Sequence, residues 1–261
     1  MPPRKRPTGK WAQGIRRTRD VSKQKLNILI WGASGVGKTR FLGTAPRTFI
    51  IATEKGTLTL YKEDIPFFQI TEDMPVFDMV MLILQSAERK EKVFKIDEDG
   101  NETDEVLVDF AEIDTIAIDS VWKLNEMILT ELCDVANRDK ASFDEWGLLL
   151  AKMSKIIARL IAMDYHSIIT IGQAVKKDEM EEDEKVMEFN MRGSYRHQIA
   201  YEFDFNLYFA EETRGTRSEY VAYTKDANKR TAKSRVPLPP KLVNPNFDMI
   251  WDVVQAELKS A

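Results

Sequence analysis

Cysteine and histidine are almost absent from the 261-residue chain, which has one cysteine, Cys133, and two histidines, His166 and His197. A lone cysteine forms no intramolecular disulfide, and so few Cys and His side chains exclude a zinc site of the Cys/His type. The chain has no run of 18 apolar residues, so no membrane span is expected. Its first residues hold no apolar stretch of signal-peptide length. We therefore expect a protein of the reducing cytoplasm that does not use the membrane.

Glycine and proline are also sparse, at 12 and 10 residues, which excludes collagen-like and Gly/Pro-rich disordered chains. Hydrophobic residues make up 43% of the sequence, and the length is ample for a buried core. These numbers predict a globular protein of one large domain or two small ones.

The net charge of −4 is unevenly distributed, because residues 1–25 carry nine basic side chains against one acid, Asp20. This segment has a charge of +8, which leaves −12 for residues 26–261. We expect residues 1–25 to form a flexible basic arm. Two interpretations stay open: the arm adds phosphate contacts to a nucleic-acid complex, or it is a solvated leader without a partner.

Apolar runs of strand length alternate with stretches of helical periodicity along the rest of the chain. A hairpin is predicted around the acidic turn of residues 92–110, and the helix from residue 75 has Asp73 or Thr71 available as its cap. The pattern favours an α/β protein with a mostly parallel central sheet, helices on both faces and antiparallel strands at one edge. Strands are expected at 26–31, 48–53, 113–119, 165–171, 203–210 and 219–224, and helices at 75–90, 121–137, 142–161 and 247–259.

The segment GASGVGKT at residues 32–39 fits the phosphate-binding pattern G-x-x-x-x-G-K-[ST] at every fixed position. It follows a predicted strand and opens a predicted helix, as that pattern requires. Its glycines let backbone N–H groups approach phosphate oxygens, and Lys38 supplies a positive charge to the β- and γ-phosphates. We therefore predict a P-loop that binds ATP. The residues expected to bind it are Gly32, Ala33, Ser34, Gly35, Val36, Gly37, Lys38, Thr39 and the adjoining Arg40.

The second cofactor expected at this site is Mg²⁺, with Thr39 and Asp119 as its protein ligands. Thr39 offers a hydroxyl, and Asp119 ends the apolar run IAID, where a second magnesium ligand is expected. Many ATPases place a glutamate directly after this aspartate to polarise the attacking water, but Ser120 stands there. Glu54, at the end of the strand after the P-loop, is therefore the predicted base. Gln173, at the end of a later apolar run, is predicted to sense the γ-phosphate.

A basic stretch between Lys225 and Arg235 is the predicted source of a further cation for the phosphates. Lys233 and Arg235 are preferred because their spacing places both on one face of a short strand. Lys229 and Arg230 are the fallback, and a solvated hairpin is the alternative. A cation delivered from a neighbouring subunit would stabilise charge on the transferred phosphoryl group.

Residues 176–200 are polar, mostly acidic and without clear periodicity, so we expect a mobile loop there. Tyr195 stands among Arg192, Arg196 and His197, which makes it either a base-stacking candidate for single-stranded nucleic acid or an ordinary loop tyrosine. GTP specificity is disfavoured, because the nearest match to the guanine-binding pattern [NT]-K-x-D has Ala227 at its last position. A small-molecule kinase is disfavoured by the acidic character of the same 176–200 segment.

This set of motifs resembles the RecA-like ATPase core, and more closely the phage ATPases of single-strand annealing and recombination, a group also described as phage AAA-type nucleotide-binding proteins. The resemblance covers about residues 24–255. The P-loop is specific, whereas the other motifs are specific only jointly. The matching segments are GASGVGKT (32–39), ATEKG (52–56), IAIDS (116–120), SFDEWG (142–147), IGQ (171–173), Phe203-Asp204, KSR (233–235) and NPNF (244–247).

The resemblance implies a homo-oligomer in which the loop after Gln173 approaches single-stranded DNA. It also implies that Lys233 and Arg235 reach a neighbour's γ-phosphate, and that a phage-encoded protein acts in the host cytoplasm. The chain departs from the family in the acidic first half of that loop and in showing no additional DNA-binding domain.

We therefore expect one RecA-like ATPase domain over residues 26–261, a Mg²⁺-dependent enzyme acting on single-stranded DNA in phage-type recombination or annealing. The alternative is a nucleotide-gated assembly or packaging ATPase without recombination activity. Stimulation of ATP turnover by single-stranded DNA distinguishes the two.

Overall fold

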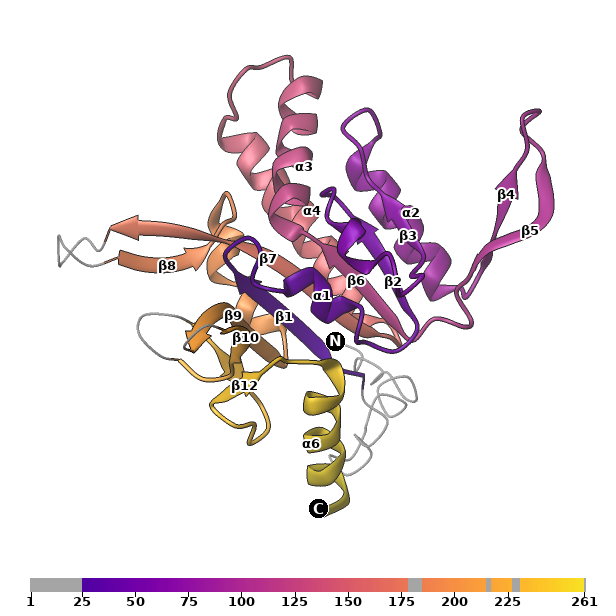
Figure 1. Cartoon of the computed structure of the whole chain (residues 1–261). Helices are drawn as coiled ribbons and strands as arrows, with labels where there is room; N and C mark the ends of the chain where they lie inside the picture. Colours follow the sequence, from indigo (N-terminus) through magenta and orange to yellow (C-terminus); the bar gives the residue numbers. More distant parts are fainter. Residues whose placement is uncertain (1–24, 178–184, 215–216, 227–230, 261) are drawn as a thin grey trace, which may run out of the picture.

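The centre of the molecule is a twisted sheet with helices packed on both faces (Figure 1). The computed structural model describes residues 25–177, 185–214, 217–226 and 231–260, and the structural statements below concern these residues. The predicted basic arm, apart from Lys25, and the fallback residues Lys229 and Arg230 lie outside them. Within these ranges, no helix is both long and apolar enough to cross a membrane.

The strands of the sheet follow the order β12-β10-β9-β1-β7-β6-β2-β3. The ladders from β9 through β1, β7, β6 and β2 to β3 are parallel, whereas β10, β11 and β12 add antiparallel strands beside β9 and β8 pairs antiparallel with β7. The strand bounds are β1 Asn27–Gly32, β2 Thr48–Ala52, β3 Phe67–Gln69, β6 Thr115–Asp119, β7 His166–Lys177, β8 Lys185–Phe189, β9 Phe205–Arg214, β10 Arg217–Tyr223, β11 Lys233–Ser234 and β12 Lys241–Val243.

Two hydrophobic layers hold the helices against the sheet. On one face, α2, α3 and α4 pack on side chains such as Leu29 and Ile118, and on the other face α1 and α6 pack on Ile28 and Ile30. Because neighbouring residues of β1 point to opposite faces and both layers are apolar, this strand is a continuous apolar run. The helix bounds are α1 Lys38–Leu42, η3 Thr57–Leu60, α2 Val76–Glu88, α3 Val121–Val135, α4 Phe143–Ala162, η4 Ser194–His197, α5 Ile199–Glu202 and α6 Phe247–Ser260. The α/β P-loop fold predicted from the sequence is confirmed.

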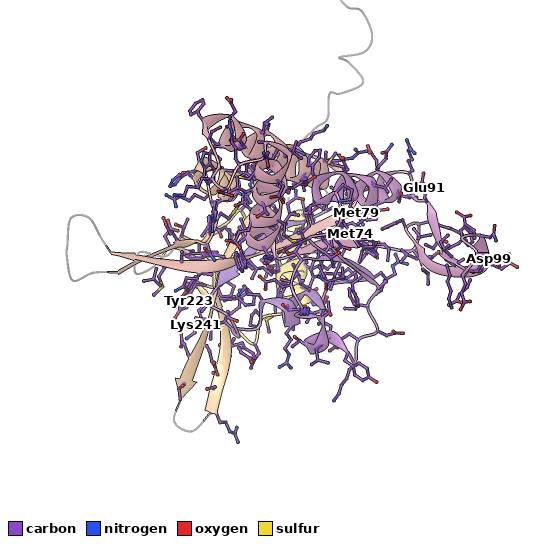
Figure 2. The ribbon with its side chains drawn as sticks, turned by 90° about the horizontal axis from the view of Figure 1, so that it is seen from above. Met74, Met79, Glu91, Asp99, Tyr223 and Lys241 are labelled. Atoms are coloured by element: carbon purple, nitrogen blue, oxygen red, sulfur yellow. The ribbon has the colours of Figure 1, made fainter. Side chains whose placement is uncertain are left out.

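The hairpin predicted at residues 92–110 is present as β4 Lys92–Ile96 and β5 Glu102–Asp109, a two-stranded sheet of its own. It projects from the body of the molecule, and Figure 2 shows Asp99 at its far end. At the opposite side of the main sheet, Tyr223 and Lys241 lie together on β10 and β12, with the ammonium of Lys241 5.8 Å from the Tyr223 ring centre (Figure 2).

Two predicted helix starts had different outcomes. The helix expected from residue 142 begins with a capping box: the Asp144 N–H donates to the Ser142 hydroxyl over 3.3 Å, and the Ser142 N–H donates to Glu145 Oε2 over 2.6 Å. The caps expected for the helix at residue 75 are wrong, since Pro75 occupies the capping position and makes no side-chain cap. Glu131 of α3 instead accepts the Phe77 N–H over 3.3 Å, a partner that local sequence does not reveal.

Residues 178–184, within the segment where a mobile loop is expected, lie outside the described residues, and the parts on either side of them form regular structure. Strand β7 does not end at Gln173 but continues to Lys177 and pairs with β8, from Gln173 opposite Phe189 onwards. The segment beyond β8 forms η4 and α5. Sequence periodicity did not reveal this antiparallel extension, because it depends on the pairing of β7 with β8.

Candidate nucleotide-binding site

The predicted P-loop connects the end of β1 to the start of α1, at the edge of the sheet where the parallel strands end. Gly32 lies beside β9 so closely that a Cβ there would overlap the carbonyl oxygen of Phe209. Gly37 precedes α1 with a φ of 88°, a conformation that favours glycine. The sequence motif therefore occupies the strand–turn–helix position that its chemistry requires.

Lys38 is folded back over its own loop. Its ammonium donates to the carbonyl oxygens of Gly32 and Ala33, over 3.0 and 2.6 Å. Burial lowers the pKa of Lys38, and the negative charges of Asp119 and Glu54 oppose that shift. The ammonium, the two predicted acids and the P-loop therefore belong to one electrostatic cluster.

Asp119 lies at the end of β6 and is 7% exposed. The Thr39 hydroxyl donates to its Oδ2 over 2.7 Å, and the Thr170 hydroxyl donates to its Oδ1. Burial raises the pKa of Asp119, although both hydroxyls and the Lys38 charge act in the opposite direction. A buried carboxylate with a raised pKa is stabilised by a further positive charge at the site.

The donor atoms of Thr39 and Asp119 fit Mg²⁺. Both offer oxygen, and Mg²⁺ commonly takes one or two protein ligands together with substrate phosphates and water. No group of three or more His, Cys, Asp or Glu side chains suited to a metal occurs in the part of the chain that the structure describes. The pair predicted from the sequence is thus brought into direct contact.

Glu54 reaches the same strand end through the pairing of β2 with β6. Ala52 is opposite Asp119 in that ladder, and the Thr53 N–H donates to the Asp119 carbonyl over 2.7 Å. The Ser120 hydroxyl then donates to Glu54 Oε1 over 2.7 Å. Ser120, whose peptide bond with Asp119 is cis, is therefore a site residue that sequence reasoning treated only as a missing glutamate.

Gln173 lies one residue beyond Gly172, which is opposite Gly32 in the β1–β7 ladder. Its side chain is held by Tyr208 of β9, whose hydroxyl donates to Gln173 Oε1 over 3.0 Å. The structure thus places Gln173 next to the start of the P-loop, although within a longer strand than predicted.

Lys233 and Arg235 are remote from the P-loop of their own chain. In β11, Lys233 and Ser234 pair with Asn206 and Phe205 of β9, and Phe205 is opposite Ile28 near the beginning of β1. The P-loop follows the other end of that strand. Within one chain, neither cation is therefore placed to contact the P-loop.

The prediction that Lys233 and Arg235 share one face of a strand is wrong, because β11 ends at Ser234. The Lys233 ammonium donates to the Ala200 carbonyl over 3.2 Å inside one cavity. Arg235 lines a different cavity and forms an ion pair with Asp204, 3.1 Å from its Nη1 to the Asp204 Oδ1. Arg235 has a largely exposed side chain, with 59% of its surface accessible.

The base-stacking candidate Tyr195 is also corrected. It is 2% exposed, and its hydroxyl donates to Glu202 Oε1 over 2.8 Å. Burial raises the pKa of its phenol. A ring enclosed in this way does not stack on an incoming base, and the tyrosine exposed in this region is Tyr201, on α5.

A small cavity of about 210 Å³ adjoins the P-loop, and sequence reasoning did not find it. Gly37 and Arg40 form one side of it, and Tyr220, Asn244 and Asn246 contribute the other. Three atoms of the Tyr220 ring come within 3.4 Å of the Cβ position of Gly37. The motif NPNF at residues 244–247 was the only sequence signal for the other side of this cavity. It gave no indication that β10 brings an aromatic ring to the P-loop.

Comparison with known proteins agrees with this geometry. A family model described as an AAA domain matches residues 24–236, well over half of the chain, and a search of curated proteins found no match. The chain belongs to this AAA domain family of P-loop ATPases.

Proposed function

We propose that this AAA-domain protein is a Mg²⁺-dependent ATPase of the RecA-like phage group and that it acts on single-stranded DNA in recombination or annealing. The contact between Thr39 and Asp119 carries the catalytic part of the proposal, because it joins the P-loop to a buried acid that a bound cation would stabilise. The resemblance of the motifs supports the DNA part.

In the proposed reaction the P-loop backbone and Lys38 hold the β- and γ-phosphates. On binding, Lys38 exchanges its hydrogen bonds to the Gly32 and Ala33 carbonyls for bonds to phosphate oxygens. Bound Mg²⁺, held by Thr39 and Asp119, supplies positive charge to the phosphates. The adenosine occupies the cavity between Arg40 and Tyr220.

Glu54 is the proposed base. A water oxygen forms a bond to the γ-phosphorus, the bond from that phosphorus to the bridging β–γ oxygen breaks, and Glu54 accepts the proton of the water. Ser120 fixes the Glu54 carboxylate through its hydroxyl. Gln173 responds to the γ-phosphate and is connected to β9 by Tyr208.

A cation from a neighbouring subunit completes the proposed site. Arg235 suits this role because its side chain is largely exposed and lies far from its own P-loop. Lys233 takes part with Arg235 if its ammonium leaves the Ala200 carbonyl on assembly. ATP turnover then depends on a homo-oligomer.

The proposal is tested by measuring ATP hydrolysis with and without single-stranded DNA, with duplex DNA of equal length as the control. We expect Mg²⁺-dependent turnover that single strands raise and duplex DNA raises less. The Lys38→Ala protein controls for contaminating ATPases.

Turnover that no DNA changes would reject the DNA part and favour the alternative, a nucleotide-gated assembly or packaging module. Absence of Mg²⁺-dependent turnover under all conditions would reject the ATPase assignment itself.

A further inference from the structure

A second cavity, of about 450 Å³, lies on the antiparallel side of the sheet, between β8, α5 and the β9–β11 pair. This is within the usual size of small-molecule sites. It adjoins none of the P-loop residues. Among the side chains lining it are Trp31, Phe189, Ala200, Tyr201, Asn206 and Lys233.

Asn206 supplies the most specific feature of this cavity. It is 1% exposed, and its Nδ2 donates to the Thr231 carbonyl over 3.2 Å. That bond fixes which way the amide points, because a rotated amide would set two oxygens against each other. Asn206 Oδ1 is then a buried acceptor with no hydrogen-bond partner among the described residues. Such an atom is satisfied by a ligand that offers an N–H group.

The walls of the cavity suit a flat ring. Trp31 packs edge-on against Phe189, with 5.0 Å between ring centres, and both rings face apolar surface. Tyr201 also lines the cavity, and 78% of its surface is exposed. An exposed ring beside an apolar wall provides a stacking surface for a planar heterocycle.

Among the described residues of the cavity, Lys233 and Asp226 are charged side chains whose hydrogen bonds are to neutral backbone groups. Arg196 is paired with Glu188, 3.3 Å from its Nη1 to Oε1, and Asp226 already accepts the Ala232 N–H over 2.6 Å. Lys233 donates only to the neutral Ala200 carbonyl, and no carboxylate lies within ion-pair distance of it in the described part of the chain. The Lys233 ammonium is therefore the group of the described lining that a ligand phosphate would contact, away from the carboxylate of Asp226.

We propose that this cavity binds one nucleotide unit, with an N–H of the base donating to Asn206 Oδ1, the base lying against Tyr201, and the phosphate next to Lys233. Two sources share this chemistry: a free nucleoside monophosphate, or one nucleotide of a single strand. The second source rests on the proposed function, whereas the first does not.

Three variants test the cavity. Asn206→Leu removes the free acceptor at similar volume, and the Thr231 carbonyl keeps its bond from Trp31 Nε1, at 2.9 Å, so the fold is expected to persist. Tyr201→Ala removes the exposed ring without disturbing the core. Tyr61→Ala is the matched control, because Tyr61 is 83% exposed and lies beside η3, outside the cavity.

The probes are a labelled oligothymidylate, an abasic strand of equal length, and thymidine monophosphate. The monophosphate is measured in the Lys38→Ala background, so that the P-loop contributes little. For single strands, we expect the wild-type protein to prefer thymidylate over the abasic strand by about fivefold or more. Asn206→Leu and Tyr201→Ala should each remove most of this preference, and Tyr61→Ala should leave it unchanged.

The outcomes distinguish the two ligand sources from each other, and they show which results would overturn the cavity proposal. Sensitivity of the oligomer alone assigns the single strand, and sensitivity of the monophosphate alone assigns a free nucleotide. If only Asn206→Leu has an effect, the cavity binds the nucleotide unit but its base does not stack on Tyr201. If Asn206→Leu changes neither ligand, the cavity proposal is overturned. DNA-stimulated ATP turnover with no effect of Asn206→Leu overturns the cavity alone, and the ATPase proposal stands.

Discussion

The two sides of strand β1 differ in how their polar groups are committed. On the parallel side, Lys38, Thr39, Asp119, Ser120 and Glu54 contact one another or share one electrostatic cluster. On the antiparallel side, Arg235 is exposed, and the cavity has an unpaired acceptor at Asn206. The parallel side is therefore prearranged within one chain. The antiparallel side has groups that remain accessible to the partners we propose, although Arg235 is paired with Asp204 within the chain.

The difference shows that the parallel strands and the antiparallel strands bring together different sets of residues in this fold. Parallel strands bring their carboxyl ends to one edge, so residues far apart in the sequence meet around the P-loop. Among the antiparallel strands, β10 runs back along β9 and brings Tyr220 to the P-loop, whereas β11 pairs with the start of β9, at the opposite edge. Each of the following experiments tests one side while holding the other intact.

Lys38→Ala is expected to have the largest effect. The variant loses the ammonium that contacts the phosphates, so ATP turnover should fall to the background of the assay. The antiparallel side should be unaffected, and DNA binding without nucleotide should persist. Hydrolysis at the wild-type rate would refute the assignment of the P-loop.

Arg235→Ala should reduce turnover by about 10³- to 10⁵-fold while leaving ATP binding near normal, since cations supplied in trans have effects of that size in other P-loop enzymes. Asp204→Asn is the matched control, because it breaks the same ion pair but keeps the arginine. If Asp204→Asn is equally impaired, Arg235 has a structural role only.

Mixing the Arg235→Ala and Lys38→Ala proteins sharpens this test. A mixed assembly contains an intact Lys38 facing an intact Arg235, so activity should exceed the sum of the two variants alone. No recovery, in assemblies shown to contain both proteins, would contradict a contact between subunits.

Glu54→Gln should lower turnover by about 10²- to 10⁴-fold with ATP binding retained, because the amide accepts the Ser120 hydrogen bond but does not take a proton from water. Glu98→Gln, at the exposed turn of the β4–β5 hairpin, is the control for loss of one negative charge. Pre-steady-state hydrolysis with labelled ATP measures the chemical step. An unchanged rate would show that a residue other than Glu54 is the base.

The smallest expected effect is that of Asp119→Asn on the stability of the nucleotide-free protein, which should increase. The pKa of Asp119 is raised on folding, so its contribution to stability is present below the unfolded pKa of about 3.9 and is lost as the pH rises through the folded pKa. At neutral pH the ionised carboxylate therefore destabilises the nucleotide-free protein. We expect the variant to have a higher Tm than the wild type when nucleotide is absent.

Thermal unfolding without nucleotide measures this gain, and the difference from wild type should shrink as the pH is lowered. Asp139→Asn, at an exposed position, should show no such trend. A variant less stable than wild type at neutral pH would show that the hydroxyls of Thr39 and Thr170 compensate fully for burial of the charge.

The parallel side was largely predictable from the sequence. Buried parallel strands are short apolar runs, and the P-loop is a local motif, so β1, β2 and β6 lie where the pattern placed them. The proximity of Thr39 and Asp119 was also predictable, since both were expected to hold the same Mg²⁺. The roles assigned to these residues, and to Glu54, remain predictions for the experiments above.

The antiparallel side was not predictable in the same way. The extension of β7 to Lys177 depends on pairing with β8 rather than on local pattern. Tyr195 is surrounded by polar neighbours in the sequence, yet it packs into the core. Lys233 and Arg235 diverge because β11 ends between them. Each failure concerns a residue whose environment is built by distant segments.

Gly32 bears on how the P-loop motif would behave under selection. Its Cα lies against the backbone of β9, where any side chain would overlap the Phe209 carbonyl. A library of substitutions at this position, screened only for soluble expression and never exposed to ATP, would already return glycine. A screen for nucleotide binding would return the same residue for a different reason. Persistence of glycine at position 32 in descendants that had lost ATP binding would therefore be no sign that the activity survived.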